Sequence, residues 1–327
     1  MVGKKKVALM LCGLLVGTVL VGCGAEKKDE KKKIGVVQFI QHGALDAANE
    51  GFIAGLKEKG YEDKVVIEQQ NAQGKIDVAQ QIAGQFVSDK KDLIFAIATP
   101  TAQAAYNSTK DIPIVFTAVT DPVTDGLAND WKGSGRNTTG TSDMVNIDEQ
   151  LDLFKKLVPS AKTLGVIYTT SETNSVNQVN KLKELAPKHG LEIKEIGVAN
   201  INEINQNLTN AMASVDGIYA PTDNNVAASY ELVGNICLKN NKPILGAEPA
   251  VVEKGGLVSK GLDYFELGKM AAYKAVEIFE GKSPSDIEIE TMKELAITIN
   301  TDVAKKLNIT IPEDIDKVAK KVTGGVN

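Results

Sequence analysis

The 327-residue sequence has few of the residues that carry metal binding or redox chemistry in most proteins. It contains three cysteines and two histidines, His42 and His189. Two of the cysteines lie within the first 23 residues, so the body of the chain has Cys237 alone and can form no intrachain disulfide. Cys237 follows an apolar stretch and is expected in a core. One cysteine and two histidines argue against a zinc site of the usual ligands.

Arginine is almost absent, since Arg136 is the single arginine among 37 basic residues. The net charge of the whole chain is −5. Residues 1–33 carry eight lysines against three acidic residues, which leaves about −10 on residues 34–327. An acidic body argues against nucleic acid as a partner. The scarcity of arginine indicates an AT-rich genome, and with the lysine-rich start it favours a Gram-positive cell.

Enzyme and regulator motifs are missing as well. The sequence has no nucleophile elbow, no Walker loop and no glycine-rich dinucleotide turn after its first apolar run. No DNA-reading helix-turn-helix precedes residue 34, which argues against a sugar-repressor-like regulator. We therefore expect no catalytic residues, no cofactor and no metal.

The N-terminus is typical of an exported lipoprotein. Lys4, Lys5 and Lys6 precede an apolar run at 7–20, which is too short to span a bilayer comfortably and fits the apolar region of a signal peptide. The run ends in LVGC, which resembles a bacterial lipobox. We predict a signal peptide at 1–22, a lipid on Cys23 and a flexible, charged tether at 23–33. The chain would then be held on the extracytoplasmic face of the cell membrane; the alternative is an uncleaved anchor helix.

Beyond the tether, apolar β-rich runs alternate with amphipathic stretches of helical length. This alternation predicts an α/β fold with parallel sheets covered on both faces. It begins again near residue 147, which indicates two doubly wound lobes joined by a multi-strand hinge that permits closure over a ligand. We predict lobe 1 at 34–142 plus about 263–285, lobe 2 at 143–262 plus about 286–327, and a monomer. Strands are predicted at 34–40, 65–70, 93–98, 112–119, 163–170, 191–199, 217–223, 242–248 and 294–300, and helices at 45–59, 76–89, 101–109, 147–157, 175–187, 203–214, 225–239 and 264–281.

Ligands of open parallel sheets bind beyond the carboxyl ends of the strands, so the residues that follow each strand are the candidates. Hydroxyl-rich helix starts suit a carboxylate, and buried acids suit an ammonium group, although each could equally be a helix cap. Together the two kinds of group describe a site for an α-amino acid. The candidate residues are Phe39, His42, Thr99, Thr101, Ala102, Asp121, Ser142, Asp143, Ser171, Asn174, Ser175, Thr222, Asp223, Asn224, Glu248 and Tyr264.

Five segments in order resemble one family: IGVVQFIQHGALDAANEGF, ATPTAQAA, FTAVTDPV, TGTSD and PTDNNV are similar to motifs of the ABC-transporter substrate-binding lipoproteins related to tryptophan- and tyrosine-binding proteins. The resemblance implies a type I periplasmic-binding-protein fold, an ABC permease as partner, and an aromatic amino acid as ligand, tyrosine first and tryptophan second. A nucleoside or branched-chain amino acid as ligand, and a role as a surface adhesin, stay open as alternatives.

The resemblance also implies residue roles. Asp143 and Asp223 would take the ammonium group, and Phe39 and His42 would border the side chain. Gly43 stands where family members often have proline, which leaves the shape of that loop open. The ligand carboxylate would be held by Thr101, Ala102, Ser171, Asn174 and Ser175.

Overall fold

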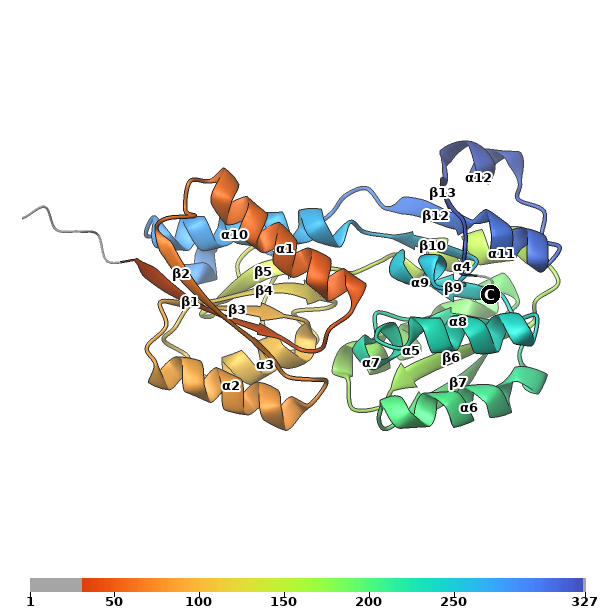
Figure 1. Ribbon diagram of the computed structural model, residues 1–327, viewed down its shortest axis with the longest axis horizontal. Coiled ribbons are helices and arrows are strands. Elements are labelled where there is room, and N and C mark those ends of the chain that lie inside the picture. The colour runs from red at the N-terminus through yellow and green to blue at the C-terminus, as the bar shows by residue number, and fades with distance from the viewer. Residues whose placement is uncertain (1–30, 326–327) are drawn as a thin grey trace, which may run out of the picture. The chain divides into compact units, whose positions relative to one another are not determined.

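A computed structural model describes residues 31–325 of the chain (Figure 1). The predicted signal peptide, Cys23 and most of the tether lie outside the described residues. No helix within residues 31–325 is long and apolar enough to cross a membrane.

The first sheet is parallel throughout and has the strand order β11-β5-β4-β3-β1-β2. Two helices lie on each of its faces, α1 with α10 and α2 with α3 (Figure 1). We call this part lobe 1. Its strands are β1 (Lys32–Gln38), β2 (Val65–Asn71), β3 (Leu93–Ile97), β4 (Ile114–Val119), β5 (Thr138–Ser142) and β11 (Glu290–Thr291), and its helices are α1 (Gly43–Glu58), α2 (Ile76–Ser88), α3 (Thr99–Ser108) and α10 (Tyr264–Phe279).

The second sheet has the order β13-β12-β10-β9-β8-β6-β7 and belongs to what we call lobe 2. It is parallel except between β10 and β12, so β12 and β13, which are parallel to each other, run opposite to the other strands. Its strands are β6 (Thr163–Thr169), β7 (Glu192–Val198), β8 (Gly217–Ala220), β9 (Ile244–Gly246), β10 (Val258–Gly261), β12 (Ala296–Asn300) and β13 (Lys320–Val322). Its helices are α4 (Ile147–Leu157), α5 (Thr173–Leu185), α6 (Ile204–Ala211), α7 (Asn224–Ala227), α8 (Tyr230–Lys239), α9 (Ala250–Glu253), α11 (Thr301–Lys306) and α12 (Glu313–Val318).

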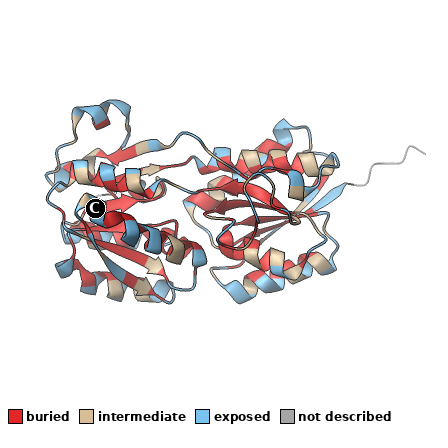
Figure 2. Ribbon diagram, turned by 180° about the vertical axis from the view of Figure 1, so that it is seen from behind, coloured by how far each residue is buried: buried red, intermediate tan, exposed pale blue. Residues whose placement is uncertain are grey.

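Short 3₁₀ helices extend or join these elements at η1 (Ala186–His189), η2 (Ile201–Glu203), η3 (Met212–Ser214) and η4 (Pro284–Asp286). The central strands of both sheets are buried on both faces (Figure 2). Side chains along β8 alternate between two cores: Tyr219 packs with α4 and α5, and Ile218 packs with α6 and α8. Cys237 is fully buried in the second of these cores, as the sequence predicted.

The predicted alternation of strands and helices is confirmed, but several elements differ. Strands β10, β11 and β13 and the short helix α9 were not predicted. The helix predicted at 225–239 is divided into α7 and α8. Strand β5 was missed because its sequence, TTGTS, lacks the apolar residues of a buried strand. Its hydroxyl groups are satisfied instead by neighbouring carbonyls: Thr138 donates to Leu127 and Ser142 donates to Thr120.

Three chain segments cross between the sheets: 142–147, 261–264 and 291–296. The third crossing follows β11, which pairs with β5, so the first sheet receives residues as late as Thr291. Several separate crossings permit rotation of one lobe against the other while resisting other movements.

Helices α1 and α10 pack closely because glycines face each other's backbone. A Cβ atom on Gly268 would lie 1.9 Å from the carbonyl oxygen of Ala48, and one on Gly51 would lie 1.9 Å from the carbonyl oxygen of Phe265. Such distances are impossible without separating the helices. This contact closes one face of lobe 1.

The close packing predicts that Gly268→Ala lowers the free energy of unfolding by about 1–3 kcal/mol through overpacking. Gly84→Ala is the matched control, because Gly84 also lies within a helix but a Cβ there meets nothing within 4 Å. That variant should be more stable by about 0.5–1 kcal/mol, from helix propensity. Urea unfolding followed by circular dichroism measures both. Equal effects of the two substitutions would show that the helix contact is not tight.

Candidate ligand-binding site between the two sheets

A small cavity of about 10 Å³ lies between the lobes, at the carboxyl ends of the strands. Side chains from the starts of α1, α7 and α10 surround it, together with residues that follow β5, β8 and β9. Three of its lining side chains, Leu45, Ala118 and Ala227, are apolar. The full lining is His42, Leu45, Ala118, Asp143, Thr222, Asp223, Asn224, Ala227, Glu248 and Tyr264.

Two carboxyl groups of the cavity keep an oxygen without a hydrogen-bond partner. These are Oδ1 of Asp143 and Oε1 of Glu248, both buried. The Tyr264 hydroxyl donates to the other Asp143 oxygen over 2.9 Å. Burial raises the pKa of Asp143. Burial also raises the pKa of Glu248 to about 7, although the hydroxyls of Tyr230 and Tyr264 act to lower it. The lining contains no lysine or arginine, so a bound cationic group would relieve both acids.

Asp223 has a different environment, because groups of lobe 2 donate hydrogen bonds to both of its carboxyl oxygens. It accepts hydrogen bonds from the Thr169 N–H (2.5 Å) and hydroxyl (2.9 Å), from the Ser175 hydroxyl (2.7 Å) and from the Val226 N–H (2.9 Å). The last bond caps α7. Burial raises the pKa of Asp223, and these donors oppose the shift. Asp223 therefore ties β6, α5 and α7 together.

Glu172 is a buried acid that the sequence did not single out as a site residue. It follows β6 and accepts the backbone N–H and side-chain amide of both Asn224 and Asn225. Burial and the neighbouring Asp223 carboxyl raise the pKa of Glu172 to about 8. Its position in the segment that follows β6 was the available signal.

His42 joins the lobes. Its Nε2 lies 3.4 Å from Oδ1 of Asn224, and its buried Nδ1 has no partner among the described residues. Burial lowers the pKa of His42 to about 4, so the ring is neutral at pH 7.

Further hydrogen bonds connect the lobes beside the cavity. The hydroxyls of Thr120 and Thr222 lie 3.0 Å apart. Asp125 accepts from the Thr173 hydroxyl over 2.8 Å and from the Asn177 amide over 3.2 Å. These contacts place the lobes in a closed arrangement.

Several predicted residues use their polar groups elsewhere. The Thr101 hydroxyl donates to the carbonyls of Ile97, at the end of β3, and Ala98, directly before α3, and the Asn174 amide donates to the Thr222 carbonyl. Ala102 is buried in the lobe 1 core, while Thr99 keeps a buried hydroxyl without a partner.

The remaining predicted residues also lie away from the cavity. Phe39 is 1% exposed and packs in the core of lobe 1 instead of bordering the cavity. Asp121 caps the turn that follows β4, and the Ser142 hydroxyl bonds a carbonyl. Ser171 is exposed and lines a separate pocket beside α3.

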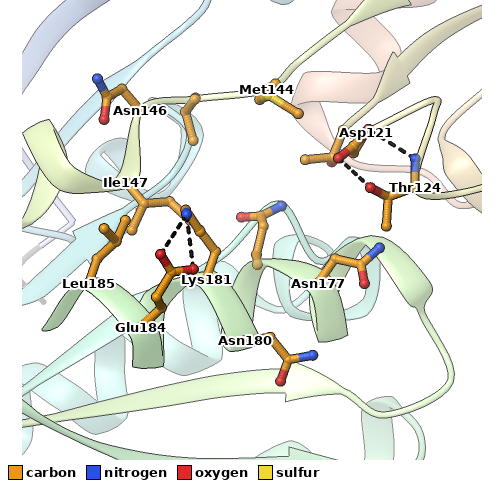
Figure 3. Close-up of a pocket in the computed structure, with 13 residues that line it drawn as sticks. Asp121, Thr124, Met144, Asn146, Ile147, Asn177, Asn180, Lys181, Glu184 and Leu185 are labelled. Atoms are coloured by element: carbon orange, nitrogen blue, oxygen red, sulfur yellow. Dashed lines mark hydrogen bonds and ion pairs between the residues drawn. The ribbon is translucent and has the colours of Figure 1, made fainter. Parts of the chain in front are cut away.

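A larger, open pocket lies next to the cavity, between the 121–124 turn, the crossing at 144–147 and α5 (Figure 3). Thr120 and Gln178 belong to its lining and also contact Thr222 of the cavity. Two pairs of its lining side chains bond each other: Asp121 accepts from Thr124, and Lys181 forms an ion pair of 2.9 Å with Glu184. Within residues 31–325 no cluster of histidine, cysteine and acidic side chains could hold a metal ion.

Two parallel-sheet lobes, repeated crossings and a cavity at the strand ends define the type I periplasmic-binding-protein fold. Distant solute-binding proteins share it: structures with bound myo-inositol and 5-methylthioribose align at TM-scores of 0.63 and 0.61 with 18% and 12% sequence identity. Residues 33–323 match the family model described as ABC transporter substrate binding protein. The chain belongs to this family, whose members act outside the cytoplasm with an ABC transporter, and the predicted family is confirmed.

Closer relatives are found among bacterial proteins. A tyrosine-binding protein of Clostridioides difficile is 44% identical over 320 residues, which cover 94% of this chain and 93% of that protein. The ABC domain from Streptococcus pneumonia in complex with L-Trp is 37% identical at a TM-score of 0.87, covering 89% of this chain and 99% of that one.

The ligand-free, open structure of a substrate-binding protein with adhesive properties from Clostridium difficile is 44% identical, with the same coverage of 89% and 99%. Its TM-score is nevertheless lower, at 0.68. The open structure is thus more similar in sequence than the L-Trp complex but less similar in shape. This difference agrees with closed lobes in the present structure.

The structural role of Asp223 predicts a loss of stability on substitution. Asp223→Ala leaves four buried donors unpaired and should lower the free energy of unfolding by about 3 kcal/mol or more. Asp121→Ala is the control, because Asp121 accepts similar bonds from Val123 and Thr124 at a partly exposed turn and should cost less. Chemical unfolding measures both. An unchanged stability of Asp223→Ala, with a loss of ligand affinity, would assign Asp223 to the ligand instead.

Proposed function

We propose that this protein captures an aromatic amino acid outside the cytoplasm, tyrosine first and tryptophan second, and delivers it to an ABC permease. The observation that carries the proposal is the pair of unpaired, buried carboxyl oxygens of Asp143 and Glu248 in the cavity. An α-ammonium group between them would supply the missing donors and the missing positive charge. The 44% identity to a tyrosine-binding protein and the L-Trp complex of a relative support the aromatic class.

The ligand carboxylate would extend beyond the lining of the cavity to the starts of α3 and α5, the segments that hold Thr99, Thr101, Ala102, Asn174 and Ser175. Neither helix has an N-cap side chain bonded to its first turn. Free N–H groups and the positive end of the helix dipole attract a carboxylate. In this arrangement the backbone, more than the hydroxyl groups, would hold the ligand, because the Thr101 and Ser175 hydroxyls already have partners.

Closure would couple binding to recognition by the permease. His42 and Tyr264 of lobe 1 and Glu248 of lobe 2 line one cavity, so a ligand touches both lobes only when they are shut. Binding would shift the population to the closed form, and the permease would distinguish the two forms. In this proposal lobe 1 and lobe 2 move relative to each other, and the protein is a monomer.

We further propose that the mature protein begins at Cys23 and is held on the membrane by lipid there. Residues 23–33 would be the tether, after removal of the signal peptide at 1–22. The support is the sequence of the N-terminus, and a Gram-positive surface suits this arrangement because an untethered receptor would be lost.

A second candidate function is adhesion at the cell surface. It is favoured by the adhesive properties of the relative from Clostridium difficile, which is 44% identical to this chain. We rank adhesion second because it does not explain the buried acidic residues of the cavity.

The first test is isothermal titration of residues 31–327 with each of the common amino acids. We expect saturable binding of tyrosine and tryptophan and little heat from acidic or basic amino acids. Absence of binding by every aromatic amino acid would refute the proposed ligand class.

Binding should also depend on pH. In the empty cavity burial raises the pKa of Glu248 to about 7, so the group is largely protonated below that pH. A ligand ammonium favours the ionised form, and binding therefore releases a proton. Affinity should rise between about pH 5 and about pH 8, by up to about tenfold per pH unit below the pKa. Titration over this range measures the slope, and Glu248→Gln should flatten it. A flat profile in the unaltered protein would exclude Glu248 from the ammonium site.

A further inference from the structure

The hydrogen bonds around Asn224 determine which nitrogen of His42 carries a proton. The Asn224 side-chain N–H donates to a Glu172 oxygen, and the Asn224 backbone N–H donates to the same oxygen. The amide oxygen of Asn224 therefore faces His42. A carbonyl oxygen can only accept, so Nε2 of His42 is the protonated nitrogen and donates to it.

The other nitrogen of His42 is consequently a free acceptor. The ring is neutral, because burial lowers its pKa to about 4, and a neutral imidazole with a proton on Nε2 has a lone pair on Nδ1. Nδ1 is buried and has no donor among the described residues. A buried acceptor without a donor costs stability unless a bound molecule supplies one.

The cavity separates this acceptor chemically from the two acids. Asp143 and Glu248 offer charged oxygens that suit an ammonium group, whereas His42 offers a neutral acceptor. Leu45 lies one turn along α1 from His42 and, with Ala118 and Ala227, provides the apolar part of the lining. A ring with its own hydrogen-bond donor would complement all of these groups.

We propose that Nδ1 of His42 accepts a hydrogen bond from the ring of the ligand, and that this bond selects aromatic amino acids whose ring carries a donor. The phenol O–H of tyrosine and the indole N–H of tryptophan both qualify, while phenylalanine has none. The inference rests on the proposed function and adds to it a reason why tyrosine and tryptophan, but not phenylalanine, are the ligands of choice.

The test is the ratio of dissociation constants for phenylalanine and tyrosine, which does not depend on the fraction of active protein. The unaltered protein should bind tyrosine at least about tenfold more tightly than phenylalanine, because the unpaired acceptor penalises phenylalanine. It should also prefer tryptophan to 1-methyltryptophan, which lacks the N–H. His42→Leu should bring both ratios close to one, and His42→Asn, which keeps an acceptor at the δ position, should retain part of the preference.

His189→Asn is the control, since His189 is the other histidine of the chain and pairs with Asp148 on lobe 2, 3.0 Å away. It should leave both ratios unchanged. Equal affinity for tyrosine and phenylalanine in the unaltered protein, or unchanged ratios in His42→Leu, would overturn the inference while leaving an aromatic ligand in place. Failure of every aromatic amino acid to bind would instead overturn the proposed function.

Discussion

The structure depends on buried carboxyl groups whose hydrogen-bonding capacity the protein itself only partly satisfies. Four acids lie in or beside the cavity between the lobes, and lobe 2 satisfies two of them, Asp223 and Glu172, with N–H and O–H donors. Asp143 and Glu248 each retain an oxygen without a donor. Because a buried carboxyl oxygen without a donor is costly, a ligand that donates to these two acids would stabilise the closed form. Ligand binding and lobe closure are thereby linked through the same two carboxyl groups.

The fold could be predicted from the sequence because buried parallel strands appear as continuous apolar runs separated by helical periodicity. Strand β5 escaped prediction because hydroxyl groups, with carbonyl partners far along the chain, take the place of apolar side chains. The candidate site was partly predictable for a related reason. The rule that ligands lie beyond strand ends located His42, Asp143, Thr222 and Glu248, but it could not show that the Thr101 and Ser175 hydroxyls are used within their own lobe.

The bonds that hold the lobes together are few and mostly between neutral groups, such as the hydroxyls of Thr120 and Thr222. Bonds of this kind contribute about 1 kcal/mol each. They stabilise the closed form only weakly. A ligand that adds contacts to both lobes can therefore shift the equilibrium from the open to the closed form. The lower TM-score to the open relative than to the L-Trp complex agrees with a molecule that has two arrangements.

The path of the chain has a consequence for the order of folding during synthesis. Lobe 1 starts at β1 but is completed by α10 and β11, which follow most of lobe 2 in the sequence. Until α10 has been made, α1 lacks its helix partner and one face of the first sheet is only partly covered. Lobe 1, which is begun first, is therefore finished only after most of lobe 2 has been made. The N-terminal half of the chain cannot complete a stable core until residues 264–291 have been synthesised.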